Sequence, residues 1–174
     1  MRYCRLRVNE GKSAVASPTK RKFLGYSFYY KNGTYRLRVH PKSLNRLKDK
    51  VREVTNRNVS MNFETRLKKL IEKTRGWVNY FKLADMSKSL KEMDGWIRRR
   101  LRACIWKTWK KIRTRFTSLN KLGIDRNKAW EFANTRKGYW RISNSPIMQR
   151  SITNERLEKR GYVSMSTMYK KVIL

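Results

Sequence analysis

Residue types that catalyse hydrolysis or nucleotidyl transfer are few in this sequence, and their spacing brings none of them together. His40 is the only histidine, and no nearby residue would make it a base or a metal ligand. The 12 carboxylates are scattered, and no pair lies on one extended strand as two-metal nucleotidyl transfer requires. We therefore expect no catalytic residues, no metal ion and no cofactor, and a chain that binds rather than catalyses on its own.

The residues that do cluster by chemistry are cations and tryptophans. Nine positive residues and no carboxylate fall within residues 98–115, where guanidinium and ammonium groups can neutralise phosphates and indoles can stack on bases. Because these unbalanced charges repel one another in a free monomer, an anionic partner would relieve them. The segment therefore predicts a nucleic-acid contact made by Arg98, Arg99, Arg102, Trp106, Lys107, Trp109, Lys110, Lys111 and Arg113.

A single long helix over residues 86–115 would position these side chains. At about 100° per residue, one side of this helix carries the cations, with Trp106 and Trp109 among them. A second interpretation is that both tryptophans pack against a following module while the arginines are solvated. The other side is an apolar stripe with the three-to-four residue period of a helix, formed by Met86, Leu90, Met93, Ile97, Leu101, Cys104 and Ile112.

The overall composition also indicates a polyanionic partner. Lys and Arg number 45 against 12 acids, and the net charge of +33 is spread along all 174 residues. An anionic membrane surface is the alternative for a basic amphipathic helix, but the apolar stripe matches other helices better. No apolar run reaches the ~20 residues of a membrane span, and Cys4 and Cys104 are too few for a disulfide framework. We expect a cytoplasmic protein that binds nucleic acid and no membrane.

Residues 1–41 are predicted to form strands. Asn32-Gly33 lies between two β-prone runs, 23–30 and 34–39, which is typical of a type I′ hairpin. The tyrosines of these runs either stack on bases or pack within the protein, and packing is favoured. Because an isolated two-stranded hairpin is only marginally stable in water, we expect this part either to stay mobile or to pair with another molecule.

Residues 42–115 are predicted to form a small bundle of three amphipathic helices with short connections. The second helix spans about 63–81, and residues 85–87 would cap the third. Gly76 lies inside the second helix, where glycine costs about 1 kcal/mol relative to alanine. We interpret it as a point of close backbone packing.

Residues 116–174 are predicted to form a compact module of short helices. Asp125 can cap one of them and Ser145-Pro146 can begin another, whereas 138–142 looks extended. The aromatic residues of this part require burial, so it is not a disordered tail. Basic residues persist here, and we add three of them to the predicted binding set, namely Arg136, Lys137 and Arg141.

Eight segments of the sequence follow one another in a specific order: RLRVNEGKS, KRKFLGYSF, LRVHPKSLNRLKDKVRE, RGWVNYFKLAD, EMDGWIRRRLR, CIWKTWKK, RKGYWRISNSPI and TNERLEKRG. In this order they resemble the C-terminal part of a bacterial group II intron-encoded reverse transcriptase, or maturase. The resemblance covers nearly the whole chain. Its most specific part is RGWVNYF followed by WIRRRLR and KGYWR.

The resemblance and the periodicity together predict the fold and its division. The fold class is mainly α with a small N-terminal β-hairpin, and a three-helix thumb-like bundle is followed by a compact module of short helices. The resemblance implies that residues 1–41 are the remnant of a reverse transcriptase palm. It assigns 42–115 to the thumb, or maturase-specific X domain, and 116–174 to a small DNA-binding-like domain.

The resemblance also implies roles for particular residues. Lys12 matches a lysine motif near the incoming nucleotide, and residues 23–25 match a hairpin that supports the primer. Residues 75–80 and 98–113 correspond to parts that bind intron RNA or a template–primer duplex. The predicted nucleic-acid-binding set therefore also includes Lys12, Arg75, Trp77, Asn79 and Tyr80.

The catalytic Tyr-Ala-Asp-Asp strand of that family, its fingers and its C-terminal nuclease are not in this sequence. We therefore expect a nucleic-acid-binding fragment of a maturase, which binds group II intron RNA in splicing and retrohoming. Target DNA and an RNA–DNA duplex are the expected further partners. One alternative is the thumb half of a split reverse transcriptase that needs an upstream palm chain, and another is a basic structural component of a ribonucleoprotein.

Overall fold

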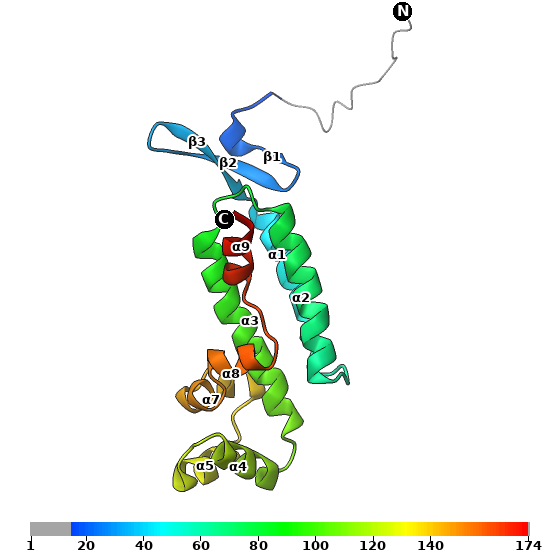
Figure 1. Ribbon diagram of the computed structural model, residues 1–174, viewed down its shortest axis with the longest axis vertical. Helices are drawn as coiled ribbons and strands as arrows, with labels where there is room; N and C mark the ends of the chain where they lie inside the picture. The colour runs from blue at the N-terminus through cyan, green and yellow to red at the C-terminus, as the bar shows by residue number, and fades with distance from the viewer. Residues whose placement is uncertain (1–14, 174) are drawn as a thin grey trace, which may run out of the picture.

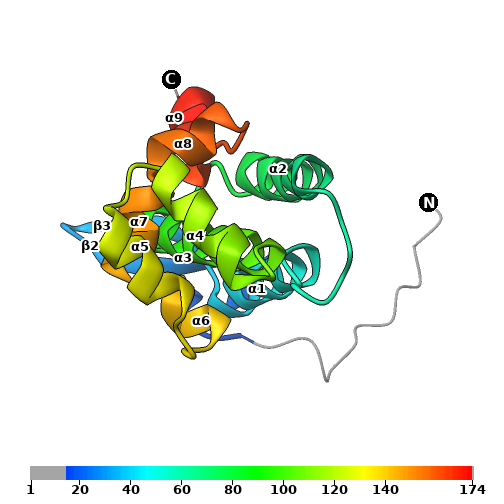
Figure 2. The same ribbon diagram turned by 90° about the horizontal axis from the view of Figure 1, so that it is seen from below.

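The computed structural model describes residues 15–173, and it is mainly helical with one small antiparallel sheet at its N-terminal end (Figure 1). The predicted binding residue Lys12 lies outside the described residues. The sheet sits across one end of a set of long helices, and short helices surround the other end of the longest one (Figure 2). The predicted fold class is thus confirmed.

The sheet has three strands in chain order, β1 (Lys22–Phe23), β2 (Tyr26–Lys31) and β3 (Thr34–Val39), and a 3₁₀ turn, η1 (Pro18–Lys20), precedes them. Asn32 and Gly33 connect β2 to β3 at φ 51° and 76°, which are the left-handed conformations of a type I′ turn. The predicted hairpin is confirmed. The predicted first strand is divided, however, because the chain turns before β2 and adds β1 as a third strand.

Gly25 makes the turn between β1 and β2 and also lets the sheet approach the helices. Its φ is 88°, and a Cβ at this position would lie 3.0 Å from the Phe81 ring and 3.0 Å from the Ser43 hydroxyl. Only glycine satisfies both constraints.

Two tyrosines of β2 attach the sheet to the helical part. Tyr29 donates a hydrogen bond to an Asp85 carboxylate oxygen at 2.6 Å, and Tyr26 donates to the Tyr80 carbonyl. The Asp85 amide in turn donates to the Leu37 carbonyl at 2.8 Å. The sheet therefore packs on the protein's own helices, and these tyrosines do pack, as favoured.

Three long helices form the bundle, namely α1 (Pro41–Val54), α2 (Phe63–Tyr80) and α3 (Ser87–Thr108). Each buries the stripe that its periodicity predicts. The main core residues are Leu47, Val51 and Val54 from α1, Leu67, Leu70 and Val78 from α2, and Leu90, Met93, Ile97 and Leu101 from α3.

The predicted helix over 86–115 is wrong at its C-terminal end, because the chain breaks at residues 109–111 and begins a new helix, α4 (Ile112–Lys121). At the break Trp109 lies beside Trp106, with 5.6 Å between the ring centroids, and is partly buried against the core. Ile112 is left exposed instead of joining the stripe.

The short helices that follow are α5 (Arg126–Ala133), α6 (Tyr139–Ile142), α7 (Pro146–Ser151) and α8 (Asn154–Lys159). Ser145 and Asp125 cap α7 and α5 as predicted. The extended segment predicted over 138–142 is wrong, because it forms α6, whose Ile142 amide donates to the Gly138 carbonyl at 3.1 Å. No helix in the described part of the chain combines the length and apolar character needed to traverse a bilayer.

The last helix, α9 (Met165–Ile173), returns to the bundle and packs against α2 and α3. Asp94 of α3 holds its start, since its buried carboxylate accepts hydrogen bonds from the Met165 amide at 2.7 Å and the Ser166 amide at 3.0 Å. Tyr169 donates to the Ala84 carbonyl at 2.7 Å. Met165, Met168 and Tyr169 of α9 are thus part of the bundle core.

Two local interpretations of the bundle need correction. A Cβ placed at Gly76 would meet nothing within 4 Å, so this glycine is not a point of close backbone packing. Met86 precedes α3 without a side-chain cap, because the nearby Asp85 carboxylate accepts from Tyr29 instead. The Asp85 carboxylate, which the sequence pattern assigned to the cap of α3, therefore holds the sheet through Tyr29 instead.

His40 caps α1, and its titration gives a testable effect of pH on stability. Its Nδ1 accepts a hydrogen bond from the Lys42 amide at 3.1 Å. Burial, together with the charges of Lys22, Lys42 and Arg38, lowers the pKa of His40 from its ordinary value of 6.5. Because the unfolded chain then binds the proton more readily, stability is present above that value and falls as the pH drops through it.

We expect the thermal unfolding midpoint to fall by roughly 2 °C between about pH 7.5 and pH 5.5, a small effect because His40 is only half-buried and water screens its charge. His40→Asn keeps an acceptor at the cap and does not titrate in this range. Its midpoint should therefore be constant. An equal fall in this variant would show that another group is responsible.

Candidate nucleic-acid interface

Ion pairs neutralise very little of the positive charge carried by the described residues. Two ion pairs form in residues 15–173, one joining Arg52 to Asp49 at 2.6 Å and one joining Lys73 to Glu53 at 3.1 Å. Both acids are well exposed, so these pairs are screened by water. The remaining cations repel one another, and an external anion would relieve that repulsion.

Two predicted contact residues of α3 are instead buried. Trp106 is 2% exposed and is covered by Trp109 and by the Arg115 guanidinium, which lies 4.9 Å from its ring centroid. Arg102 is also buried, and it donates to the Ile152 carbonyl at 2.8 Å and to the Asn154 side chain at 3.1 Å. The prediction that both residues face the partner is wrong, because the later helices cover this side of α3.

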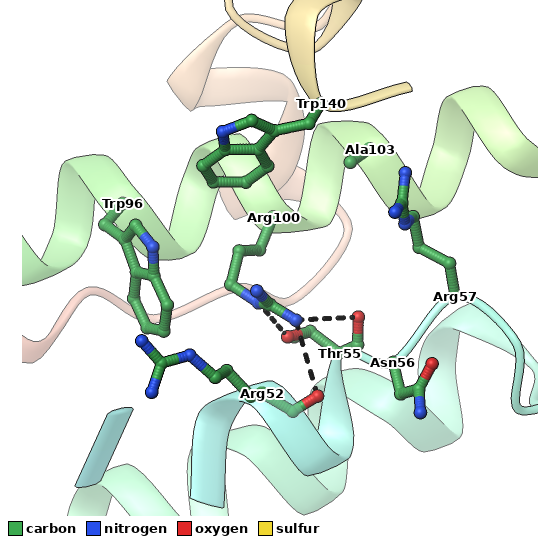
Figure 3. Close-up of a pocket in the computed structure, with 8 residues that line it drawn as sticks. All are labelled: Arg52, Thr55, Asn56, Arg57, Trp96, Arg100, Ala103 and Trp140. Atoms are coloured by element: carbon green, nitrogen blue, oxygen red, sulfur yellow. Dashed lines mark hydrogen bonds between the residues drawn. The ribbon is translucent and has the colours of Figure 1, made fainter. Parts of the chain in front are cut away.

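The open surface lies on another side of α3, where α1, α3 and α6 enclose a cavity of about 500 Å³ (Figure 3). We call it the aromatic cavity. No lining residue is acidic, and three are arginines. It is lined by Arg52, Thr55, Asn56, Arg57, Trp96, Arg100, Ala103 and Trp140.

Arg100 is fixed at the base of this cavity by the end of α1. Its Nε donates to the Thr55 hydroxyl, and its Nη2 lies 3.4 Å from the carbonyls of Arg52 and Thr55 (Figure 3). Burial lowers the pKa of Arg100; the nearby Cys104 thiol opposes that shift, and the charges of Arg52 and Arg57 add to it. A guanidinium keeps its proton, so the cavity concentrates positive charge that an anion would stabilise.

Indole rings form two walls of the aromatic cavity. The guanidinium groups of Arg52 and Arg100 lie 5.7 Å and 5.2 Å from the Trp96 ring centroid, in cation–π contact. Trp140, from α6, has the Arg99 guanidinium over one face at 3.9 Å. The two rings thus come from segments far apart in the sequence.

A second cavity, of about 350 Å³, adjoins the first through Arg57, which lines both. We call it the basic cavity. It also contains no acidic lining residue, whereas Arg66, Lys107 and Lys110 add positive charge. The Tyr139 ring lies between the two segments: its centroid is 5.4 Å from the Lys107 ammonium of α3 and 5.2 Å from the Arg57 guanidinium of the α1–α2 connection. The two cavities form one continuous cationic surface between the α1–α2 connection, α3 and α6.

The predicted residues of α2 lie elsewhere. Trp77 and Tyr80 line a groove between α1 and α2, which contains both acids and lysines, and Gly76 lies in the same groove. Arg75 and Asn79 are exposed on this helix. The structure therefore does not bring this group to the two cavities.

The other predicted residues of α3 and of the segments after it differ in exposure. Lys107 and Lys110 line the basic cavity, whereas Trp109 is partly buried against the core. Arg98 and Arg99 are half-buried. The predicted cations that are exposed but line neither cavity are Arg75, Lys111, Arg113, Arg136, Lys137 and Arg141.

Sequence reasoning missed the residues that define the aromatic cavity. Trp96, Arg100 and Ala103 recur at the three-to-four residue spacing that puts them on one side of α3. That second stripe was a usable signal. Nothing in the local sequence, by contrast, indicates that Trp140 of α6 lies beside it.

Comparison with known proteins identifies one segment. Residues 44–123 match the family model described as "Group II intron, maturase-specific domain". The segment includes most of α1 and all of α2, α3 and α4, and it carries Arg57, Trp96 and Arg100. The match confirms the predicted resemblance for this part of the chain. No curated protein matches the sequence.

Proposed function

We propose, from the premise that residues 44–123 form a group II intron maturase-specific domain, that this chain binds the RNA of such an intron and assists its splicing. One observation carries the proposal: the linings of two adjoining cavities, formed by that domain together with Trp140, include arginines and lysines but no acid. A surface of this kind neutralises phosphates where RNA helices approach one another.

The proposal predicts that RNA binding depends steeply on salt concentration and that the cations of the two cavities cause much of this dependence. A variant with Arg57→Gln, Lys107→Gln and Lys110→Gln should lose about tenfold to a hundredfold in affinity, and the slope of log K against log salt should fall by about 2–3. Filter binding of a structured intron RNA over a series of salt concentrations measures both quantities.

The matched control removes three charges at the other end of the molecule, with Lys31→Gln, Lys170→Gln and Lys171→Gln. Lys31 lies at the end of β2, and both other lysines lie on α9, away from the α1–α2 connection (Figure 1). Its salt slope should stay near that of the parent chain. Equal slopes for the two triple variants would place the RNA elsewhere, and equal affinity for any RNA of the same length would contradict a maturase role.

A second candidate function is the thumb half of a reverse transcriptase, with target DNA or an RNA–DNA duplex as partner. The observation that favours it is the exposed Phe23 and Leu24 at the β1–β2 turn, where Tyr80 donates to the Leu24 carbonyl at 3.0 Å. An apolar pair held in this way is suited to contact a further chain or a primer. DNA synthesis on addition of an upstream palm fragment would support this function, and no synthesis would count against it.

A further inference from the structure

The aromatic cavity has a composition that phosphate binding alone does not require. Phosphates are held by cations and amides, yet two of its eight lining residues are tryptophans. Its volume of about 500 Å³ also lies within the ~300–1,000 Å³ of small-ligand pockets. The cavity can therefore hold a planar ring as well as an anion.

We infer that the aromatic cavity binds one unpaired nucleotide of the RNA, with its base stacked on Trp140 and its phosphate beside Arg57. The inference rests on the proposed RNA-binding function and specifies the element that the RNA presents. It commits to a nucleotide that has left the helical stack, in a loop or a bulge.

The environment of Trp140 leaves one ring face for such a base. Arg99 covers one face, and its Nη2 also donates to the Trp140 carbonyl at 3.0 Å. Arg99 is not among the lining residues of the cavity, whereas Trp140 is, with 39% of its surface exposed. The uncovered face is thus available on the cavity side, and the stacked guanidinium holds the ring in place.

The polar residues of the cavity divide into those already engaged and those still available. Arg100 already donates through Nε to the Thr55 hydroxyl and through Nη2 to the carbonyls of Arg52 and Thr55. The Arg52 guanidinium forms an ion pair with Asp49. Arg57 is exposed, and its guanidinium lies over the ring of Tyr139. Arg57 is therefore the cation best placed to meet a phosphate.

An unpaired nucleotide fits this geometry better than a duplex does. An A-form helix presents its phosphates and a shallow groove, and its bases are stacked on one another, so an indole inside a cavity cannot reach a ring face. Bases in loops and bulges are splayed out and stack on aromatic side chains. Asn56 also lines the cavity; its Oδ1 accepts from the Asn58 amide at 3.0 Å, which leaves its Nδ2 to donate to a base edge.

The test compares Trp140→Ala with Trp130→Ala in the full chain. Trp130 is another accessible tryptophan, 57% exposed on α5, and it lines neither cavity. The probes are a stem–loop RNA and a blunt duplex of the same stem. We expect Trp140→Ala to lose about tenfold in affinity for the stem–loop and less than about twofold for the duplex, and Trp130→Ala to bind both like the parent.

Trp140→Phe, which keeps a ring for stacking, should retain most of the stem–loop affinity and guards against a loss caused by misfolding. In addition, 2-aminopurine placed at each loop position in turn should change its emission on binding at one position, and Trp140→Ala should abolish that change. Equal weakening of both RNAs, or no weakening of either, would overturn the inference. Failure of the proposed function is distinguishable, because the parent chain would then bind neither RNA with a steep salt dependence.

Discussion

Asp94→Ala is expected to lower the free energy of unfolding by about 3–5 kcal/mol, the largest loss that we predict for a single substitution. Asp94 is buried in α3 and joins segments that are some seventy residues apart in the sequence. Its Oδ1 accepts from the Tyr162 hydroxyl at 3.1 Å and from the Met165 amide. Its Oδ2 accepts from the amide and the hydroxyl of Ser166, at 3.0 Å and 2.6 Å.

Alanine at this position leaves four donors without their acceptor, those of Tyr162 and Met165 in a buried place and those of Ser166 in a partly buried one. Each buried donor costs about 1–3 kcal/mol when unsatisfied, and the partly buried ones cost less because water can reach them. The start of α9 also loses the carboxylate that its positive end attracts. Since α9 covers α2 and α3, its release exposes Met165 and Met168 as well. The loss therefore combines hydrogen bonding with apolar burial.

Urea denaturation of the variants at neutral pH measures this effect. Tyr162→Phe removes one of the four hydrogen bonds and should cost only about 1 kcal/mol. Asp94→Asn keeps one acceptor oxygen and should fall between the two. A cost for Asp94→Ala no larger than that for Tyr162→Phe would mean that α9 does not depend on this carboxylate.

The elements of the fold were predictable where their signals are local. The spacing of Leu47, Val51 and Val54 alone predicts α1. The Asn32-Gly33 pair predicts the β2–β3 hairpin, because few other residues accept two positive φ angles in succession. These signals depend only on residues close in the sequence. They therefore do not depend on how distant segments pack.

The burial of Trp106 and Arg102 was not predictable from such signals. A helical period assigns side chains to a side of α3, but it does not say which later segment covers that side. Arg102 is satisfied by Ile152 and Asn154, fifty and more residues downstream. A charged residue can therefore belong to the interior when distant carbonyls accept its hydrogen bonds.

The same limitation explains why the interface was only partly predicted. Lys107 and Lys110 were named, and they do line the basic cavity, but Arg57 lies in a connection between helices that has no periodic pattern. The prediction that residues 138–142 are extended further hid Trp140. Such a site depends on three segments meeting, which is a property of the tertiary fold.

Arg66 carries the second large effect, because it is the residue that shapes the connection bearing Arg57. It is only 4% exposed, and its guanidinium donates to the Val54 carbonyl, to the Asn56 carbonyl at 3.0 Å and to the Val59 carbonyl at 3.0 Å. The planar Arg66 guanidinium thus holds the end of α1 and the α1–α2 connection that follows it.

We expect Arg66→Ala to lower the free energy of unfolding by about 3 kcal/mol, because three carbonyls lose a charged donor. Arg66→Lys keeps the charge, but a single ammonium group cannot reach all three acceptors, so it should recover only part of the loss. Urea denaturation separates the two variants from Arg46→Lys, a control at an exposed arginine of α1 that should have no effect.

Arg66→Lys also tests whether the shape of this connection matters to RNA binding. Net charge is unchanged, so a loss of affinity in this variant would arise from the position of Arg57 and its neighbours and not from weaker electrostatics. We expect weaker binding of intron RNA with a nearly unchanged salt slope, since the number of neutralised phosphates stays the same. Parent-like affinity in a variant that has lost stability would show that the cationic surface tolerates a loose connection, and that Arg66 serves the fold alone.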